Sequence, residues 1–227
     1  MHRKLTNIQI VLDVSWSMGW ESPSRYSYAR DAIERFTLAR EGDAMGLIIF
    51  GEKQFRWIPM TKDLEAIRLA LPFANPKHQP SHMRGTAIGG ALRFAAKAMQ
   101  VDAKDEGDRV VILVSDGASD DIQNNWHLEV ADELNDAGAK VFYLHIGTDS
   151  HEPAAMEIAS LTGGRSFVAG DAAAMQAVFS TLDQMTRTTF LTEQPEPREM
   201  FRSVAWFALA ACGLHTVGLM HLRYTPW

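Results

Sequence analysis

Oxygen-bearing side chains gather where the first hydrophobic run of the sequence ends. After the run IQIVL, Asp13, Ser15 and Ser17 stand at alternate positions. Two later segments offer similar groups: Thr86 follows the dipeptide RG, and Asp116 follows the apolar run VVILVS. Carboxylate and hydroxyl oxygens are the ligands that hard cations such as Mg²⁺ and Mn²⁺ prefer. These five residues predict a site for a divalent cation, provided that the fold brings the three segments together.

The segments that must position these residues alternate between strand and helix patterns. Short apolar runs predict strands at 8–14, 46–51, 109–117, 140–147 and 165–169, and a further edge strand at 53–60. Amphipathic stretches predict helices at 23–40, 61–72, 86–99, 121–138, 152–164 and 171–190. We expect Pro23 in the first turn of its helix and Asp171 as the cap of the last one.

This alternation predicts an α/β fold with a doubly wound, mostly parallel sheet flanked by helices, over residues 6–190. The near-continuous apolar runs VVILV and VFYLHI are typical of strands that are buried on both faces. In open sheets of this kind, ligands bind outside the carboxyl ends of the strands. All three oxygen-bearing segments are expected at that edge.

The C-terminal part of the chain differs from the rest. Residues 191–201 are polar and contain proline, which predicts a linker. Residues 203–222 contain no Asp, Glu, Lys or Arg, and a helix of about 20 residues spans the roughly 30 Å of a bilayer core. We therefore expect a transmembrane helix at 202–223, with a packed or interfacial helix as the alternative because His215 lies at mid-depth.

Composition excludes several classes of function. The net charge is −6, and the arginines are scattered, so we expect no nucleic-acid partner. The single cysteine, Cys212, excludes an internal disulfide and a cysteine-based zinc site. The N-terminal residues lack the pattern of a secretory signal, which favours a cytoplasmic domain.

The pattern Asp-x-Ser-x-Ser, then Thr, then Asp resembles the metal-ion-dependent adhesion site of the von Willebrand factor A domain family, matched here by Asp13, Ser15, Ser17, Thr86 and Asp116. The resemblance implies a Rossmann-like domain without enzymatic activity, in which a carboxylate of a partner protein completes the coordination of Mg²⁺ or Mn²⁺. The segments GTAIGGAL and VVILVSDG look like the bacterial Bat-type branch in particular. That branch implies an anchor in the bacterial inner membrane, other domains of the family as partners, and assembly or chaperone work with a MoxR-type AAA+ ATPase.

Two other functions fit part of the pattern. An Asp after a first strand and a later Asp-Gly also occur in Mg²⁺-dependent phosphohydrolases of the haloacid dehalogenase type. Those enzymes need a second Asp two positions after the first, and Ser15 stands there instead. A serine cannot act as a carboxylic acid toward a leaving group, so we expect no phosphatase activity. The other alternative is a scaffold whose ion is purely structural and whose C-terminal helix carries the association.

Some residues near the predicted site have a simpler interpretation. Asp13 and Asp116 also suit turns, and Thr86 also suits a helix cap. The two tryptophans of the first segment, Trp16 and Trp20, either pack beneath their loop or anchor a partner beside the cation. The loop histidines 78 and 82 are expected on the surface rather than at an oxygen-rich metal site.

Overall fold

The computed structural model describes residues 6–40, 42–102, 107–117, 119–147 and 152–187, together with 206, 209 and 211–218. The six predicted strands are present, as β1 (Thr6–Asp13), β2 (Ala44–Phe50), β3 (Gln54–Thr61), β4 (Asp108–Ser115), β5 (Ala139–Ile146) and β6 (Arg165–Ala169). The six predicted helices are present as well, as α1 (Arg25–Leu38), α2 (Leu64–Ala70), α3 (Ile88–Asp102), α4 (Trp126–Asp136), α5 (Pro153–Leu161) and α6 (Ala172–Arg187).

The strands form one sheet in the order β3-β2-β1-β4-β5-β6. Every neighbouring pair is parallel except β2 and β3, which are antiparallel. The sheet is therefore mostly parallel, as the sequence predicts, and β3 is the expected edge strand. The strand order reverses between β1 and β4, so the topological switch point lies where these two strands end. Asp13 and Asp116 stand at the ends of those two strands.

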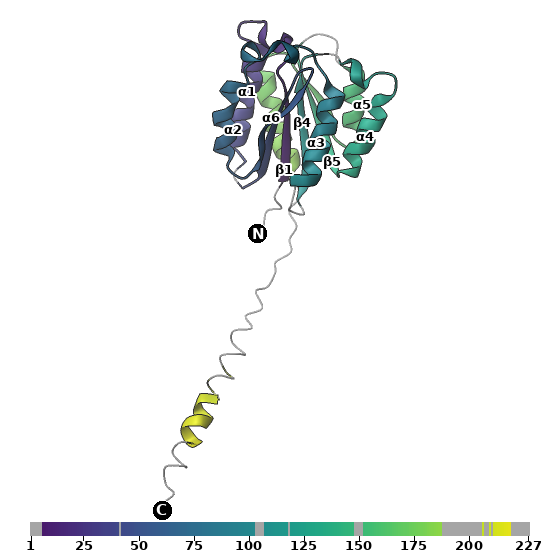
Figure 1. Cartoon of the computed structure of the whole chain (residues 1–227). Coiled ribbons are helices and arrows are strands. Elements are labelled where there is room, and N and C mark those ends of the chain that lie inside the picture. Colours follow the sequence, from purple (N-terminus) through teal and green to yellow (C-terminus); the bar gives the residue numbers. More distant parts are fainter. Residues whose placement is uncertain are drawn as a thin grey trace, which may run out of the picture. The chain divides into compact units, whose positions relative to one another are not determined.

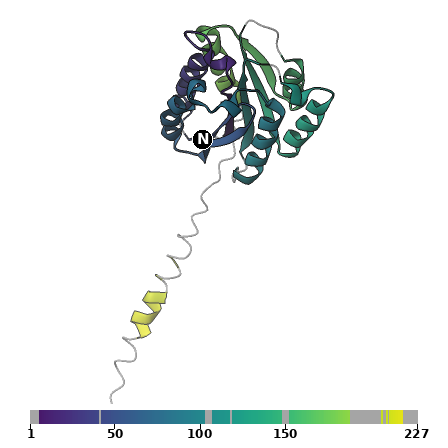
Figure 2. The ribbon, with the colours of Figure 1, turned by 45° about the horizontal axis from the view of Figure 1, so that its top comes forward.

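Helices cover both faces of the sheet (Figure 1). Alternate residues of β1 point to opposite faces, as the two-residue period of a strand requires. Ile8, Ile10 and Leu12 pack on the side of α1, α2 and α6, whereas Val11 packs on the side of α3, α4 and α5. Both cores are fully buried along β1, so the strand ends are held firmly in place. The loops at the carboxyl edge form the top of the domain in Figure 1 and come forward in Figure 2.

The start of the first helix differs from the prediction. Pro23 precedes α1 instead of lying in its first turn, and the helix begins at Arg25. Ser24 is the N-cap residue, and its side-chain oxygen accepts a hydrogen bond from the backbone N–H of Ser27. A serine cap satisfies one of the unpaired N–H groups of the first turn, which a proline cannot do. The predicted cap of α6 is confirmed, because Asp171 accepts from the N–H of Ala174.

The C-terminal part forms a unit of its own, and residues 211–218 within it are helical. The predicted linker, 191–201, lies outside the described residues, and so does most of the predicted membrane helix, 202–223. Across the portions of the chain that the structure describes, no helix has both the length and the apolar character needed to cross a membrane.

Candidate metal centre

The first segment of the candidate centre folds back on its own aspartate. Asp13 ends β1 and is fully buried, and its Oδ1 accepts a hydrogen bond of 2.8 Å from the backbone N–H of Ser15. The hydroxyl oxygens of Ser15 and Ser17 lie 3.2 Å apart. The alternate spacing of the three residues therefore places their side chains on one side of the turn.

The segment that carries Asp116 joins the first segment across the switch point of the sheet. The hydroxyl of Ser17 donates to Oδ1 of Asp116 at 2.8 Å, although 99 residues separate the two in sequence. Ser115, the last residue of β4, donates to Oδ2 of Asp13 at 2.6 Å. Because β1 and β4 are parallel neighbours, both carboxylates reach the same edge, and the two serines link them.

Thr86 approaches the same place from the loop before α3. A Cβ atom at Gly117 would lie 3.5 Å from the Oγ1 atom of Thr86, so this hydroxyl lies beside the residue that follows Asp116. The loop is fixed at two points. The N–H of Ala87 donates to the carbonyl of Gly51 at 2.8 Å, and Ser119 donates to the carbonyl of Thr86 at 3.0 Å.

The close approach of the Thr86 loop to the end of β2 requires a glycine at position 51. A Cβ there would lie 1.9 Å from the carbonyl oxygen of Met83, a backbone atom that cannot move out of the way cheaply. The end of β2 is thereby held against the loop that carries Thr86. The structure thus brings together all three sequence-predicted segments.

Negative charge is concentrated at this edge. Burial, and to a smaller extent the negative charge of Asp116, raise the pKa of Asp13 to about 7, although hydrogen bonds from Ser115 and Ser15 oppose the shift. On the other side, the guanidinium of Arg25 donates to Oδ2 of Asp116 at 2.9 Å, and the Asp116 side chain is fully buried. One guanidinium thus faces two buried carboxylates, and a further cation would relieve the remaining repulsion.

The donor set fits a hard cation. Its members are carboxylate and hydroxyl oxygens, the ligand type of Mg²⁺ and Mn²⁺. Among the described residues, no group of three or more His, Cys, Asp or Glu side chains is placed to hold a metal. His78 and His82 are exposed, as expected.

Sequence reasoning missed three residues that support the centre. Ser115 binds Asp13, Arg25 binds Asp116, and Ser119 binds the backbone of Thr86 and the N–H of Ile88. Ser115 could have been found, because it precedes Asp116 in the same segment. No pattern in the sequence pointed to Arg25 or Ser119, whose roles depend on tertiary placement.

The comparisons with known proteins agree with this geometry. Residues 8–118 match the sequence model of the von Willebrand factor type A domain. An uncharacterized protein of Borreliella burgdorferi is 28% identical over 151 residues, which cover 63% of this chain and 41% of that relative. The chain therefore spans less than half the length of this relative.

Solved structures share the fold at low sequence identity. An aerotolerance-related membrane protein from Bacteroides fragilis matches with a TM-score of 0.66 and 21% identity, over 79% of this chain and 97% of that one. BatB from Bacteroides thetaiotaomicron matches with a TM-score of 0.66 and 22% identity, over 79% and 98%. Proximal thread matrix protein 1 of the mussel byssus, whose own metal-ion-dependent adhesion site holds zinc, matches with a TM-score of 0.65 and 18% identity, over 79% and 47%. The fold and the three converging segments thus agree with the sequence match, in which residues 8–118 resemble a von Willebrand factor type A domain.

Proposed function

We propose that this chain is a non-enzymatic protein-binding module that holds Mg²⁺ or Mn²⁺ at the carboxyl edge of its sheet and captures a carboxylate of a partner protein. Asp13, Ser15, Ser17, Thr86 and Asp116 would hold the ion. When bound, the ion supplies a positive centre with an open position for an anionic ligand. The observation that carries the proposal is the chain of hydrogen bonds that joins Asp13, Ser15, Ser17 and Asp116 across β1 and β4.

Hydrolysis of phosphoesters is not supported by the geometry. The position two residues after Asp13 is Ser15, whose side chain is buried and lies 3.2 Å from the hydroxyl of Ser17. A hydroxyl of this kind does not replace the carboxylic acid that a haloacid dehalogenase-type enzyme needs. The aspartate oxygens are likewise engaged by serine donors. A binding role therefore fits the site better than catalysis.

Capture of a partner by the immobilised chain tests the proposal. We expect proteins retained in the presence of Mg²⁺ to be released by EDTA, and we expect Asp13→Ala to retain none of them because the buried carboxylate is lost. Retention that survives both EDTA and the substitution would rule the proposal out. Asp171→Ala is the matched control, because it removes a carboxylate that only caps α6.

In this proposal, Arg25 lowers the affinity of the centre for Mg²⁺. Its guanidinium lies 2.9 Å from Asp116 and adds positive charge beside the cation. Two like charges a few ångströms apart repel by roughly 1 kcal/mol or more at a protein surface. We therefore expect Arg25→Gln to raise the affinity for Mg²⁺ about 3- to 10-fold, as measured by calorimetry. An unchanged or lower affinity would show that Arg25 instead helps to hold Asp116 in place for the ion.

We further propose that residues 202–223 anchor the domain in a bacterial inner membrane and that a MoxR-type ATPase is a partner. The support is the absence of charged residues between 203 and 222 and the Bat-type character of two structural relatives. Removal of 202–227 separates anchoring from capture: the chain should leave the membrane fraction and still bind its partner in a metal-dependent manner. If capture disappears together with the anchor, the C-terminal segment is itself the binding element.

A further inference from the structure

Two exposed tryptophans stand beside the candidate metal centre. The side chains of Trp16 and Trp20 are 47% and 73% exposed, and their ring centroids lie 5.9 Å apart in an edge-on arrangement. The guanidinium of Arg84 lies over the ring of Trp16, 4.8 Å from its centroid. The N–H of Trp16 also donates to the carbonyl of Arg84. The indoles are thus presented to solvent on a fixed turn, not packed beneath their loop.

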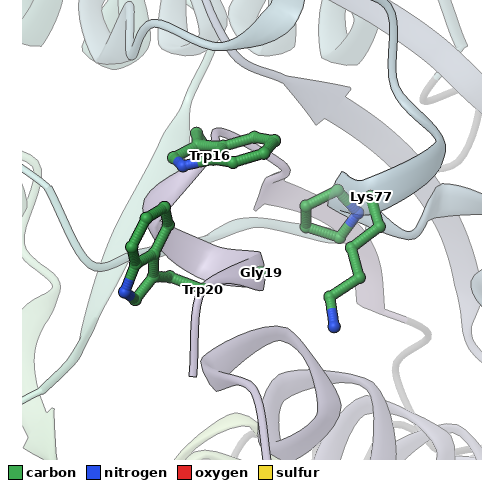
Figure 3. Close-up of a pocket in the computed structure, with 5 residues that line it drawn as sticks. Trp16, Gly19, Trp20 and Lys77 are labelled. Carbon is green, nitrogen blue, oxygen red and sulfur yellow. The ribbon is translucent and has the colours of Figure 1, made fainter. Parts of the chain in front are cut away.

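The indole pair separates two hollows. One, of about 220 Å³, is lined by Trp16, Gly19, Trp20, Pro76 and Lys77. Figure 3 shows the two indoles on one side of it and Lys77 across from them. The other, of about 270 Å³, is lined by Trp16, Ser17, Trp20, Glu21 and Arg25. Ser17 belongs to the donor set and Arg25 binds Asp116, so the second hollow borders the candidate metal centre through these two lining residues.

The size and lining of the first hollow suit a single side chain. Its volume is below the range of pockets that enclose whole small molecules. Indole faces, a proline ring and the aliphatic stem of a lysine are apolar surfaces, and the ammonium group of that lysine remains at the rim. Tryptophans in such a position are among the residues that contribute most to protein–protein affinity.

Charge around the hollow favours an acidic partner. The chain as a whole carries a net charge of −6, but residues 66–101 contain no Asp or Glu. At the hollow, this segment carries two exposed cations, Lys77 in its lining and Arg84 over the ring of Trp16. Glu21 is the exception, and its carboxylate is 3.4 Å from the guanidinium of Arg25. A local positive surface on an acidic protein attracts negatively charged segments.

We propose that Trp16, Trp20, Pro76 and Lys77 form a second binding subsite, which takes a large apolar side chain next to the metal-binding carboxylate of an acidic segment in a partner protein. This inference rests on the proposed function and names the sequence chemistry of the partner: an Asp or Glu flanked by an aromatic or large aliphatic residue. The carboxylate would go to the centre, the apolar group to the hollow, and Lys77 would favour further acidic residues nearby.

Three synthetic peptides test the subsite with the full chain in Mg²⁺: acetyl-Phe-Asp-Phe-amide, acetyl-Ala-Asp-Ala-amide and acetyl-Phe-Asn-Phe-amide. Burial of one aromatic side chain predicts that the first binds about 5- to 30-fold more tightly than the second. The third, which lacks the carboxylate, should not bind measurably. Trp20→Ala should remove the advantage of phenylalanine and leave the affinity for acetyl-Ala-Asp-Ala-amide unchanged.

Matched variants complete the test. Trp126→Ala removes another exposed tryptophan, one that lines neither hollow, and should keep the full advantage of phenylalanine. Lys77→Glu should lower the affinity for acetyl-Phe-Asp-Phe-amide several-fold, and the loss should be larger at low salt than at high salt.

The outcomes separate this inference from the proposed function. Equal, Mg²⁺-dependent binding of the two aspartate peptides would overturn the subsite and leave the metal centre standing. Absence of Mg²⁺-dependent binding for both would overturn the two together. If Trp20→Ala reduces binding to phosphatidylglycerol vesicles while the peptide affinities stay unchanged, the tryptophans contact lipid and the subsite is likewise overturned.

Discussion

Replacement of Asp13 by Asn is expected to abolish metal binding while leaving the metal-free fold intact or more stable. Two buried carboxylates share the edge of the sheet, and burial, followed by the charge of Asp116, raises the pKa of Asp13. Asn is close to Asp in size, accepts the hydrogen bond from the N–H of Ser15 and carries no charge. The substitution removes repulsion and desolvation cost in the metal-free protein, but it also removes half of the carboxylate charge that would hold a cation.

The two effects have different sizes and opposite signs. Loss of a residue that only supports a metal ligand typically costs 10- to 100-fold in affinity, so loss of a carboxylate of the donor set should cost at least about 100-fold for Mg²⁺. The free energy of unfolding in EDTA at pH 8 should stay constant or rise by about 1–2 kcal/mol. Calorimetric titration with Mg²⁺ and urea unfolding measure the two quantities.

The control for this experiment is Asp171→Asn, at the exposed cap of α6. It removes one unit of negative charge from the domain without touching the candidate centre, so the affinity for Mg²⁺ should remain within about 2-fold, as expected for a screened charge. Retained Mg²⁺ affinity in Asp13→Asn would contradict the assignment of the centre. A large loss of stability in EDTA would show instead that Asp13 is a structural residue whose charge the fold requires.

The convergence of the centre could be predicted because it follows from sheet topology. Strands β1 and β4 are recognisable as apolar runs, and the carboxyl ends of parallel strands meet at one edge, so Asp13 and Asp116 had to approach each other. The alternate spacing after β1 likewise predicted that Ser15 and Ser17 share one side of the turn. These features are local or depend only on strand order.

Contacts that depend on the placement of a helix could not be predicted in this way. Arg25 reaches Asp116 only because α1 begins at Arg25, after a serine cap, and not at Pro23 as the sequence suggested. The exposure of Trp16 and Trp20 could not be predicted either. The sequence was compatible with packing beneath the loop as well as with presentation to a partner.

The stability of the metal-free protein is expected to fall as the pH rises from about 4 to 7. The pKa of Asp13 is about 7 in the folded protein and 3.8 in an ordinary environment. Between these values, the folded state binds a proton that the unfolded state does not, so each rise in pH favours unfolding. At 1.36 kcal/mol per pH unit, the shift corresponds to a loss of roughly 2–4 kcal/mol in the free energy of unfolding between pH 4 and 8.

Mg²⁺ should reverse this trend, because a bound cation favours the ionised form of Asp13. Between about pH 5 and 7, the apparent affinity for Mg²⁺ should rise by up to 10-fold per pH unit, as one proton is released for each ion bound. Urea unfolding at pH 5 and pH 8, in EDTA and in Mg²⁺, measures both effects. Asp13→Asn has no carboxyl to titrate at this position, so its stability in EDTA should lose most of this pH dependence. The same slope in this variant would place the titrating group elsewhere, and the raised pKa of Asp13 could then no longer be taken as a mark of the metal centre.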